Sequence, residues 1–314
     1  MNWEFLWSLQ SSVHRDLAWL IASPSLLRTT DNMSAISSEE YAQWFEASKM
    51  WMKAEDDLAF YLQEKVNTPR QYKLGLYAED LMLHFFEAHP FYELLSHDLQ
   101  IFHEKPNEKQ CIGAMDFIVR SKSRGELEAS PPEIEHWEMA IKYYLQLEPS
   151  DDWNDFIGPS GKDSMHRKLT KMLGKQLPLS LRAETHKRLT SLGIPVPTRR
   201  RILSKGIFFQ QWNVAFQAPE GTDLHQPTGT WIRCKDFIEQ FIFSVKRWKI
   251  RRHPRWIAPY ITANEAELLN SEEVLAAPFE RDRFLMLSEM TPCERGWQEC
   301  HRWVLVVDSW GKIA

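Results

Sequence analysis

The chain has 314 residues, of which 43% are hydrophobic and 26% are charged, as is typical of a globular protein with a substantial core. Its formal net charge of -5 excludes a global attraction to nucleic acid but permits a local basic face. The four scattered cysteines form no CxxC pair, which indicates reduced thiols and argues against a zinc site.

Residues 1–66 are predicted to form a helical extension. Residues 16–23 and 39–66 both carry apolar side chains at helical spacing, and ISSEE at 36–40 supplies an N-cap followed by acids. The opening stretch lacks the basic segment of a signal peptide, and no run of about 18 apolar residues occurs in the chain. We therefore expect a cytoplasmic protein without a membrane partner.

Residues 67–215 are predicted to form an α/β core around one sheet. Short polar connections between its first three strands favour an antiparallel meander, and the mixture of helices and strands favours a layered α/β fold. The predicted elements are a helix at 73–90, strands at 97–104, 111–121 and 136–147, helices at 162–176 and 182–195, and a strand at 200–212.

Residues 216–314 are predicted to form a basic α+β extension that packs on the core. Residues 231–243 have a helical pattern, and residues 297–307 read as a strand. Between them, residues 245–260 are basic and aromatic, and Trp248 and Trp256 lie among the cations. These tryptophans would stack on unpaired bases or, alternatively, lie in the core under arginine stems.

Carboxylates interrupt the apolar strands of the predicted core. Asp116 follows Gly113 in IGAMDFIV, and Glu138 lies on the next strand, so an antiparallel pairing brings them within a few ångström. Two carboxylates with water and phosphate oxygens suit Mg²⁺, or Mn²⁺. Lys142 lies on the same strand face as Glu138 and would assist the attacking water, while Glu79 on the preceding helix would add a third carboxylate.

Each of these residues also has an ordinary structural interpretation. Asp116 would face solvent at a strand end, and Glu79 would belong to a solvated helix face. Glu138 and Lys142 would form a wet ion pair that contributes less than about 1 kcal/mol. The isolated histidines, including His136, are predicted to be structural.

The predicted helix at 162–176 is strongly basic. Cations at this density attract phosphate in a salt-dependent manner, although they would also suit a solvated helix face. Only Asp163 opposes them within this segment. The candidate nucleic-acid-binding residues are Lys162, Arg167, Lys168, Lys171 and Lys175.

The order of these motifs resembles the PD-(D/E)XK nuclease superfamily, whose core is a helix, three strands, a helix and a further strand. Residues 75–90, 112–120, 136–145 and 158–180 also resemble an uncharacterised bacterial family, domain of unknown function 1853. The superfamily resemblance implies that Asp116 is the metal-binding aspartate and Glu138 the second acid. The usual lysine position holds Ala140, so Lys142, or else Lys162 or Lys168, would replace that lysine.

These features predict a Mg²⁺- or Mn²⁺-dependent phosphodiesterase that acts on DNA or RNA, with DNA favoured. Glu79, Asp116 and Glu138 would hold the metal, and the basic helix would hold the nucleic-acid backbone. Ala140 favours an alternative, in which the protein binds nucleic acid or acts as an adaptor without cutting. A protein-interaction role for the tryptophan-rich N-terminal helices is a third hypothesis.

Overall fold

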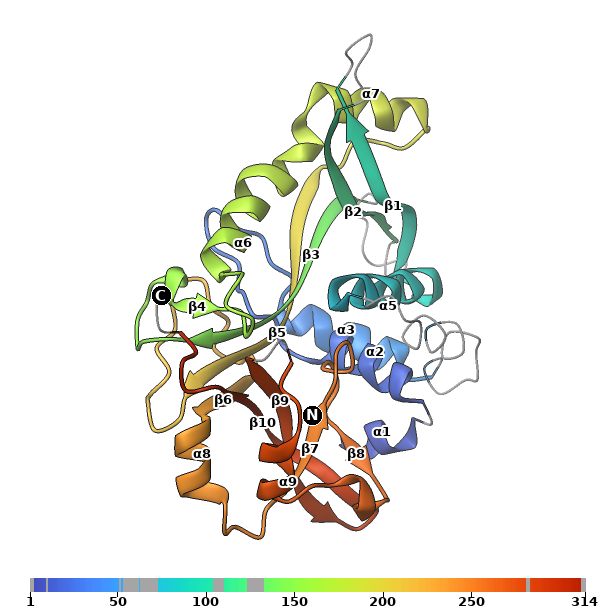
Figure 1. Ribbon diagram of the computed structural model, residues 1–314. Coiled ribbons are helices and arrows are strands. Elements are labelled where there is room, and N and C mark those ends of the chain that lie inside the picture. The colour runs from blue at the N-terminus through green and yellow to red at the C-terminus, as the bar shows by residue number, and fades with distance from the viewer. Residues whose placement is uncertain are drawn as a thin grey trace.

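One mixed β-sheet organises the part of the chain that a computed structural model describes, namely residues 3–9, 11–50, 52, 62, 73–103, 110–122, 133–280 and 283–311 (Figure 1). Its ten strands in these residues are β1 (Tyr92–Phe102), β2 (Cys111–Ser121), β3 (Ile134–Gln146), β4 (Phe156–Ile157), β5 (Arg199–Gln211), β6 (Thr228–Arg233), β7 (Arg247–Arg251), β8 (Ile261–Thr262), β9 (Phe284–Cys293) and β10 (Gly296–Val306). The main strand order is β1-β2-β3-β5-β6-β10-β9-β7, with β4 paired to β3 and β8 paired to β10.

Eight α-helices accompany the sheet in the described residues, which confirms the predicted mixed α/β class. They are α1 (Trp3–Ser8), α2 (Ser12–Ala22), α3 (Ser38–Ser48), α5 (Leu74–Ala88), α6 (Met165–Lys171), α7 (Ala183–Ser191), α8 (Cys234–Phe241) and α9 (Ser271–Ala276). After α6 the chain continues as a π-helical turn, Met172–Gln176, and a 3-10 turn, Leu177–Leu181; further 3-10 turns are Trp153–Asp155 and Glu265–Glu267.

The predicted meander is present, because β1 pairs with β2 and β2 pairs with β3, both antiparallel. The chain then crosses over through α6 and α7 and returns as β5, which pairs with β3 in parallel. Met139 of β3 packs in the core with the N-terminal helices, whereas its neighbour Ala140 packs in the core with α6. Burial on both faces explains why β3 is apolar along most of its length.

The N-terminal helices cover one face of the sheet. The side chain of Ser37 and the carboxylate of Glu40 form the capping box that starts α3. Trp44 of α3 stacks on Trp137 of β3 with 5.3 Å between the ring centroids. The helix predicted at 39–66 is present as α3, which ends at Ser48. Most of residues 51–66 lie outside the described residues.

Two predicted elements differ from the structure. The strand predicted at 97–104 begins earlier, at Tyr92, and passes Asp98 in a left-handed conformation with φ 46°. The helix predicted at 231–243 is wrong in its first part, because Thr228–Arg233 form β6 between β5 and β10, and the helix begins only at Cys234. In a short apolar segment at the centre of a sheet, hydrophobic periodicity cannot distinguish a strand from a helix, which explains the wrong prediction.

The sheet continues across the boundary predicted between residues 215 and 216. Strand β6 pairs in parallel with both β5 and β10, and β10, β9 and β7 then pair antiparallel. The predicted C-terminal extension therefore adds strands to the same sheet that carries the predicted core.

Candidate active site

Asp116 lies where strands β2 and β3 separate. The two strands pair by backbone from Arg120–Ile134 to Phe117–Trp137, and the next positions in this register are Asp116 and Glu138. There the Asp116 carboxylate replaces a backbone acceptor: its Oδ2 accepts a hydrogen bond from the Met139 N–H at 2.8 Å. This arrangement sets Asp116 and Glu138 opposite each other at the end of the paired region, which we call the strand fork.

Three carboxylates influence one another at this strand fork. Burial and the nearby charge of Glu138 raise the pKa of Asp116 to about 7. Burial and the charge of Asp116 raise the pKa of Glu79, which reaches the site from α5, to about 7. Burial likewise raises the pKa of Glu138 to about 7. The sequence-predicted acids are therefore neighbours in space, and the solvated-surface interpretation of Glu138 is wrong because its side chain is fully buried.

The candidate lysine at this site is Lys168 of α6. Burial lowers the pKa of Lys168, while the charges of Asp116 and Glu138 act in the opposite direction. Its Nζ donates to Gln176 Oε1 at 3.3 Å, and the Gln176 amide donates in turn to Glu138 Oε2. Lys168, Gln176 and Glu138 therefore form a chain of hydrogen bonds into the strand fork.

A change in helix type brings Gln176 to this position. The helix predicted at 162–176 begins instead at Met165, after the Ser164 side chain caps the Arg167 N–H, and becomes π-helical at Met172–Gln176. Figure 1 shows α6 and the turns after it running along β3 toward α7. Single π-helical turns inside α-helices are frequent at functional sites. Nothing in the sequence marks Gln176, because a lone glutamine two residues before Pro178 fits any helix end.

His136 also contacts the candidate acid. Its Nε2 lies 2.8 Å from Glu138 Oε1, and both side chains are fully buried. Burial lowers the pKa of His136 to about 4, so at neutral pH the ring is uncharged, and its Nε2 shares one hydrogen bond with Glu138 Oε1. The expectation that His136 is isolated is wrong, because residues two apart on a strand share a face.

Lys142 has a different partner from the one that the sequence suggested. Its Nζ lies 2.5 Å from Asp163 Oδ2, and the Tyr144 hydroxyl donates to the same oxygen at 3.0 Å. The alternative ion pair with Glu138 is also absent, since Glu138 bonds to His136 and Gln176. Lys142 therefore lies on the same strand as Glu138, but its ammonium group is held by Asp163.

The predicted basic residues separate into three groups. Lys171 and Lys175 line a groove of about 550 Å³ together with Arg182, and Asp116 and Gln176 lie at the same groove. Lys168 points to the acids, as described above. Lys162 and Arg167 are exposed at the start of the helix, where Arg167 donates to the Lys162 carbonyl.

The basic segment after β5 does not form a stacking surface. Trp248 and Trp256 are 0% and 7% exposed, so the base-stacking interpretation is wrong and the core interpretation is confirmed. One cation of this segment is also internal, because Arg251 pairs with Glu299; Arg201 of β5 likewise pairs with Glu40. The basic surface next to the strand fork comes instead from the π-helical turn and α6.

The fold and this site define a mixed α/β protein with a cluster of buried carboxylates beside a basic groove. The described residues contain no set of three or more His, Cys, Asp or Glu side chains already arranged as metal ligands.

The chain belongs to the family described as "Domain of unknown function (DUF1853)", which it matches over residues 15–306. No curated protein and no solved structure matches it significantly. Within the described residues, every helix is too short or too polar to cross a membrane.

Proposed function

We propose that this protein is a metal-dependent phosphodiesterase of the PD-(D/E)XK type that cuts nucleic acid, with DNA favoured over RNA. One observation carries the proposal: Asp116 and Glu138 oppose each other at the strand fork, next to a groove lined by Lys171, Lys175 and Arg182. The order of α5, the β1–β3 meander, α6 with α7, and β5 supports the superfamily resemblance. Buried acids beside a phosphate-attracting groove suit cleavage of a phosphodiester.

The donor set at the strand fork fits Mg²⁺ or Mn²⁺. Asp116 and Glu138 offer oxygen ligands, and Glu79 offers a third carboxylate nearby. Burial raises the pKa values of Asp116 and Glu138 despite the nearby charge of Lys168, so a bound cation would stabilise the ionised carboxylates. Mg²⁺ commonly takes only one or two protein carboxylates and completes its shell with water and phosphate, so a full cage is not needed. When bound, the ion would supply an activated water and charge neutralisation at the phosphate.

The surrounding side chains would divide the remaining work. Lys168 would stabilise negative charge on the phosphate or orient the attacking water, in place of the superfamily lysine that Ala140 replaces. His136 and Gln176 hold the two oxygens of Glu138 in one orientation. Lys171, Lys175 and Arg182 would bind the nucleic-acid backbone along the groove.

The test is Asp116→Asn, assayed for cleavage of single- and double-stranded DNA and RNA with Mg²⁺ or Mn²⁺. The amide keeps an oxygen that accepts the bond from Met139, so the fold should survive while metal-dependent cleavage is lost and binding remains. Glu79→Gln should weaken cleavage, whereas Glu87→Gln on the exposed side of the same helix should not. Undiminished cleavage by Asp116→Asn, purified in the same way, would end the proposal.

Ala140 supports a second candidate function, a nucleic-acid-binding or adaptor protein that keeps this fold without cutting. Ala140 is buried against α6, and its methyl group brings no charge to the strand fork. Such a protein would bind nucleic acid with a steep salt dependence, need no metal and cut nothing. Absence of binding to DNA and RNA even at low salt would contradict both candidates and favour a protein-interaction role.

A further inference from the structure

The groove beside the strand fork has two chemically different walls. One wall is the chain from the end of α6 through the π-helical turn, which carries the exposed Lys171 and Lys175 and leads to Arg182. The facing wall is the first part of β2, where Ile112 and Ala114 lie half-buried. Among the described residues, the lysine and arginine side chains that line the groove therefore all lie on one side of it.

The β2 wall also presents a strand edge that β3 leaves unpaired. Strand β2 begins at Cys111, but its pairing with β3 starts only at Phe117, opposite Trp137. Where the two strands have separated, the Met139 N–H donates to the Asp116 side chain and to no backbone group of β2. An unpaired strand edge offers N–H and C=O groups to a bound molecule, so this wall combines apolar side chains with neutral hydrogen-bonding groups.

The candidate acids lie at the inner end of the groove. Glu138 is fully buried and Asp116 is half-buried. The groove encloses about 550 Å³, which is within the range of sites for single small molecules. A nucleotide fits such a space, whereas a duplex, whose major groove alone is about 12 Å wide, is much broader. A base can therefore enter the groove only from a strand that is unpaired at that point.

The two walls match the two sides of a single strand. An unpaired strand carries phosphates along its backbone and turns its bases outward, where they contact protein surfaces. The cations of the groove suit the phosphates, and the apolar β2 wall with its open edge suits a base. A duplex keeps its bases paired and presents phosphates on both strands, but the β2 wall has no lysine or arginine to receive the second strand.

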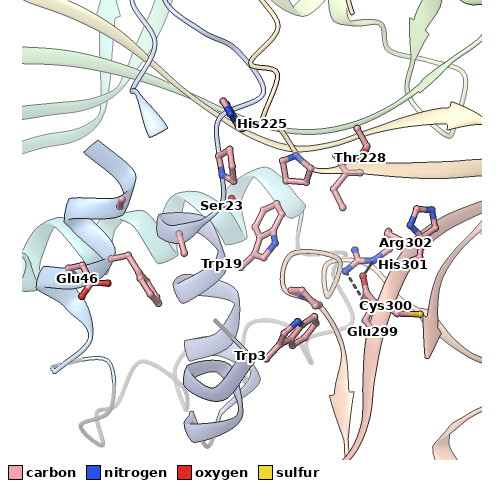
Figure 2. A pocket seen from close by; sticks show the side chains of 17 residues that line it. Trp3, Trp19, Ser23, Glu46, His225, Thr228, Glu299, Cys300, His301 and Arg302 are labelled. Carbon is pink, nitrogen blue, oxygen red and sulfur yellow. Dashed lines mark hydrogen bonds and ion pairs between the residues drawn. The ribbon is translucent and has the colours of Figure 1, made fainter. Parts of the chain in front are cut away.

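The other large cavity of the described residues does not offer the same chemistry. Figure 2 shows Trp3 and Trp19 projecting from the N-terminal helices toward the β10 segment that carries Glu299 and Arg302. The Arg302 guanidinium lines this cavity, but its Nε donates to Glu299 Oε1 at 2.6 Å. A phosphate there would have to compete with a buried carboxylate, so the groove is the better place for a nucleic-acid strand.

We propose, on the basis of the nucleic-acid binding proposed for the same groove, that its substrate is single-stranded. The phosphates would lie on Lys171, Lys175 and Arg182, and one base would pack against Ile112 and Ala114. A duplex would still lay its backbone on the cations, but its paired bases would leave the β2 wall empty. The protein therefore binds a single strand more tightly than a duplex, and cuts unpaired segments or frayed ends.

Fluorescence anisotropy of the full chain in EDTA tests strand preference without cleavage. Three labelled probes are needed: a mixed-sequence single strand of about 16 nucleotides, the same strand in a blunt duplex, and an abasic strand of equal length. We expect the single strand to bind at least about tenfold more tightly than the duplex and about fivefold more tightly than the abasic strand, because one base buries apolar surface. Equal affinity for the duplex, or for the abasic strand, would overturn the inference.

Matched variants would locate the base. Ala114→Phe should fill the space along β2 and weaken single-strand binding about fivefold or more, with duplex binding changed less than about twofold. Ile112→Ser should act in the same direction. Ile194→Ser is the control, because Ile194 is half-buried in the same core cluster but lies outside the groove. Lys171→Gln with Lys175→Gln should weaken binding of both probes.

Unchanged single-strand binding by both β2 variants, with circular dichroism confirming that they fold, would overturn the placement of the base. The nuclease proposal fails separately. Preference for the single strand without any cleavage in Mg²⁺ or Mn²⁺ would end the nuclease proposal and support a single-strand binder. Cleavage by a protein that binds duplex as tightly as single strand would support the nuclease and overturn the strand preference.

Discussion

Lys168 and Lys142 lie near the candidate acids but differ in what holds their ammonium groups. Lys168 bonds to Gln176 and faces Asp116 and Glu138, whereas Lys142 pairs with Asp163. A lysine that stabilises charge on the reacting phosphate must face the acids that hold the metal. These contacts therefore favour Lys168 for the role that the sequence first suggested for Lys142.

We predict that Lys168→Met lowers the rate of metal-dependent cleavage about 100-fold or more, as when a preorganised charge-stabilising group is removed. Lys142→Met should lower it less than about fivefold, because the Lys142 ammonium group pairs with Asp163 and does not face the acids that would hold the metal. Single-turnover cleavage would measure both rates, and urea unfolding would check both folds. A folded Lys142→Met that is inactive beside an active Lys168→Met would reverse the assignment.

Part of the candidate site could be predicted from the sequence, and part could not. Asp116 and Glu138 stand out because a carboxylate is unusual in an apolar strand. His136 and Gln176 carry no comparable signal, since a histidine on a strand and a glutamine on a helix are ordinary residues. Their contacts depend on the strand register and on the π-helical turn, neither of which has a local sequence signature here.

At the scale of elements, strand β2 was predicted with its observed bounds because turn residues flank its apolar run. β6 was missed because tertiary pairing with β5 and β10, and not a sequence period, makes it a strand. The basic helix was predicted, but its cations were treated as one face. The structure separates them: Lys171 and Lys175 join Arg182 at the groove, whereas Lys168 faces the acids.

The groove leads to a prediction about salt dependence. Lys171→Gln with Lys175→Gln should lower the slope of log affinity against log salt by about 1.8, since each phosphate contact contributes about 0.9 on double-stranded DNA. Lys235→Gln with Arg295→Gln removes two exposed cations elsewhere and serves as the control. Fluorescence anisotropy over a salt series would measure the slopes. Equal slopes for the two double variants would show that nucleic acid does not bind at the groove.

The ion pair between α3 and β5 predicts how stability depends on pH. Arg201 is buried and donates to both oxygens of Glu40, at 2.6 Å for Oε1 and 2.5 Å for Oε2. Burial alone would raise the pKa of Glu40, but the hydrogen bonds and charge of Arg201 outweigh it and hold that pKa below its usual value of 4.5. The pair therefore stabilises the fold above this usual value and loses its contribution as Glu40 becomes protonated at lower pH.

We predict that Glu40→Gln lowers the free energy of unfolding at pH 7 by about 2 kcal/mol, because a charge-assisted pair to a buried arginine is lost. The difference from wild type should shrink as the pH falls below 4.5, because protonation of the wild-type carboxylate removes the charge from the pair. Glu39→Gln, at the exposed neighbour, is the control and should stay within about 0.5 kcal/mol of wild type. Urea unfolding at several pH values would measure this, and a constant difference down to pH 3 would contradict it.

For the whole molecule, buried hydrogen bonds connect the N-terminal helices and the predicted core to residues after 215. Asp16 Oδ1 accepts from the Ala258 N–H at 2.8 Å. The Tyr143 hydroxyl donates to the Trp256 carbonyl at 3.0 Å, and Trp231 Nε1 donates to the Gln146 carbonyl at 2.8 Å. With the shared sheet, these contacts make independent folding of the predicted regions unfavourable, because each alone would expose apolar surface and unpaired backbone groups.

We therefore predict that the full chain unfolds in one cooperative transition, in which calorimetric and van't Hoff enthalpies agree to within about 10%. A fragment of residues 1–215 should fail to fold, because β5 would lose β6 along its edge and Trp231 and Trp256 would be missing from the core. Scanning calorimetry of both chains tests this, with tryptophan fluorescence as a second probe of the full chain. Two separated transitions in the full chain, one of them reproduced by the fragment, would show that the C-terminal region is an independent unit despite the continuous sheet.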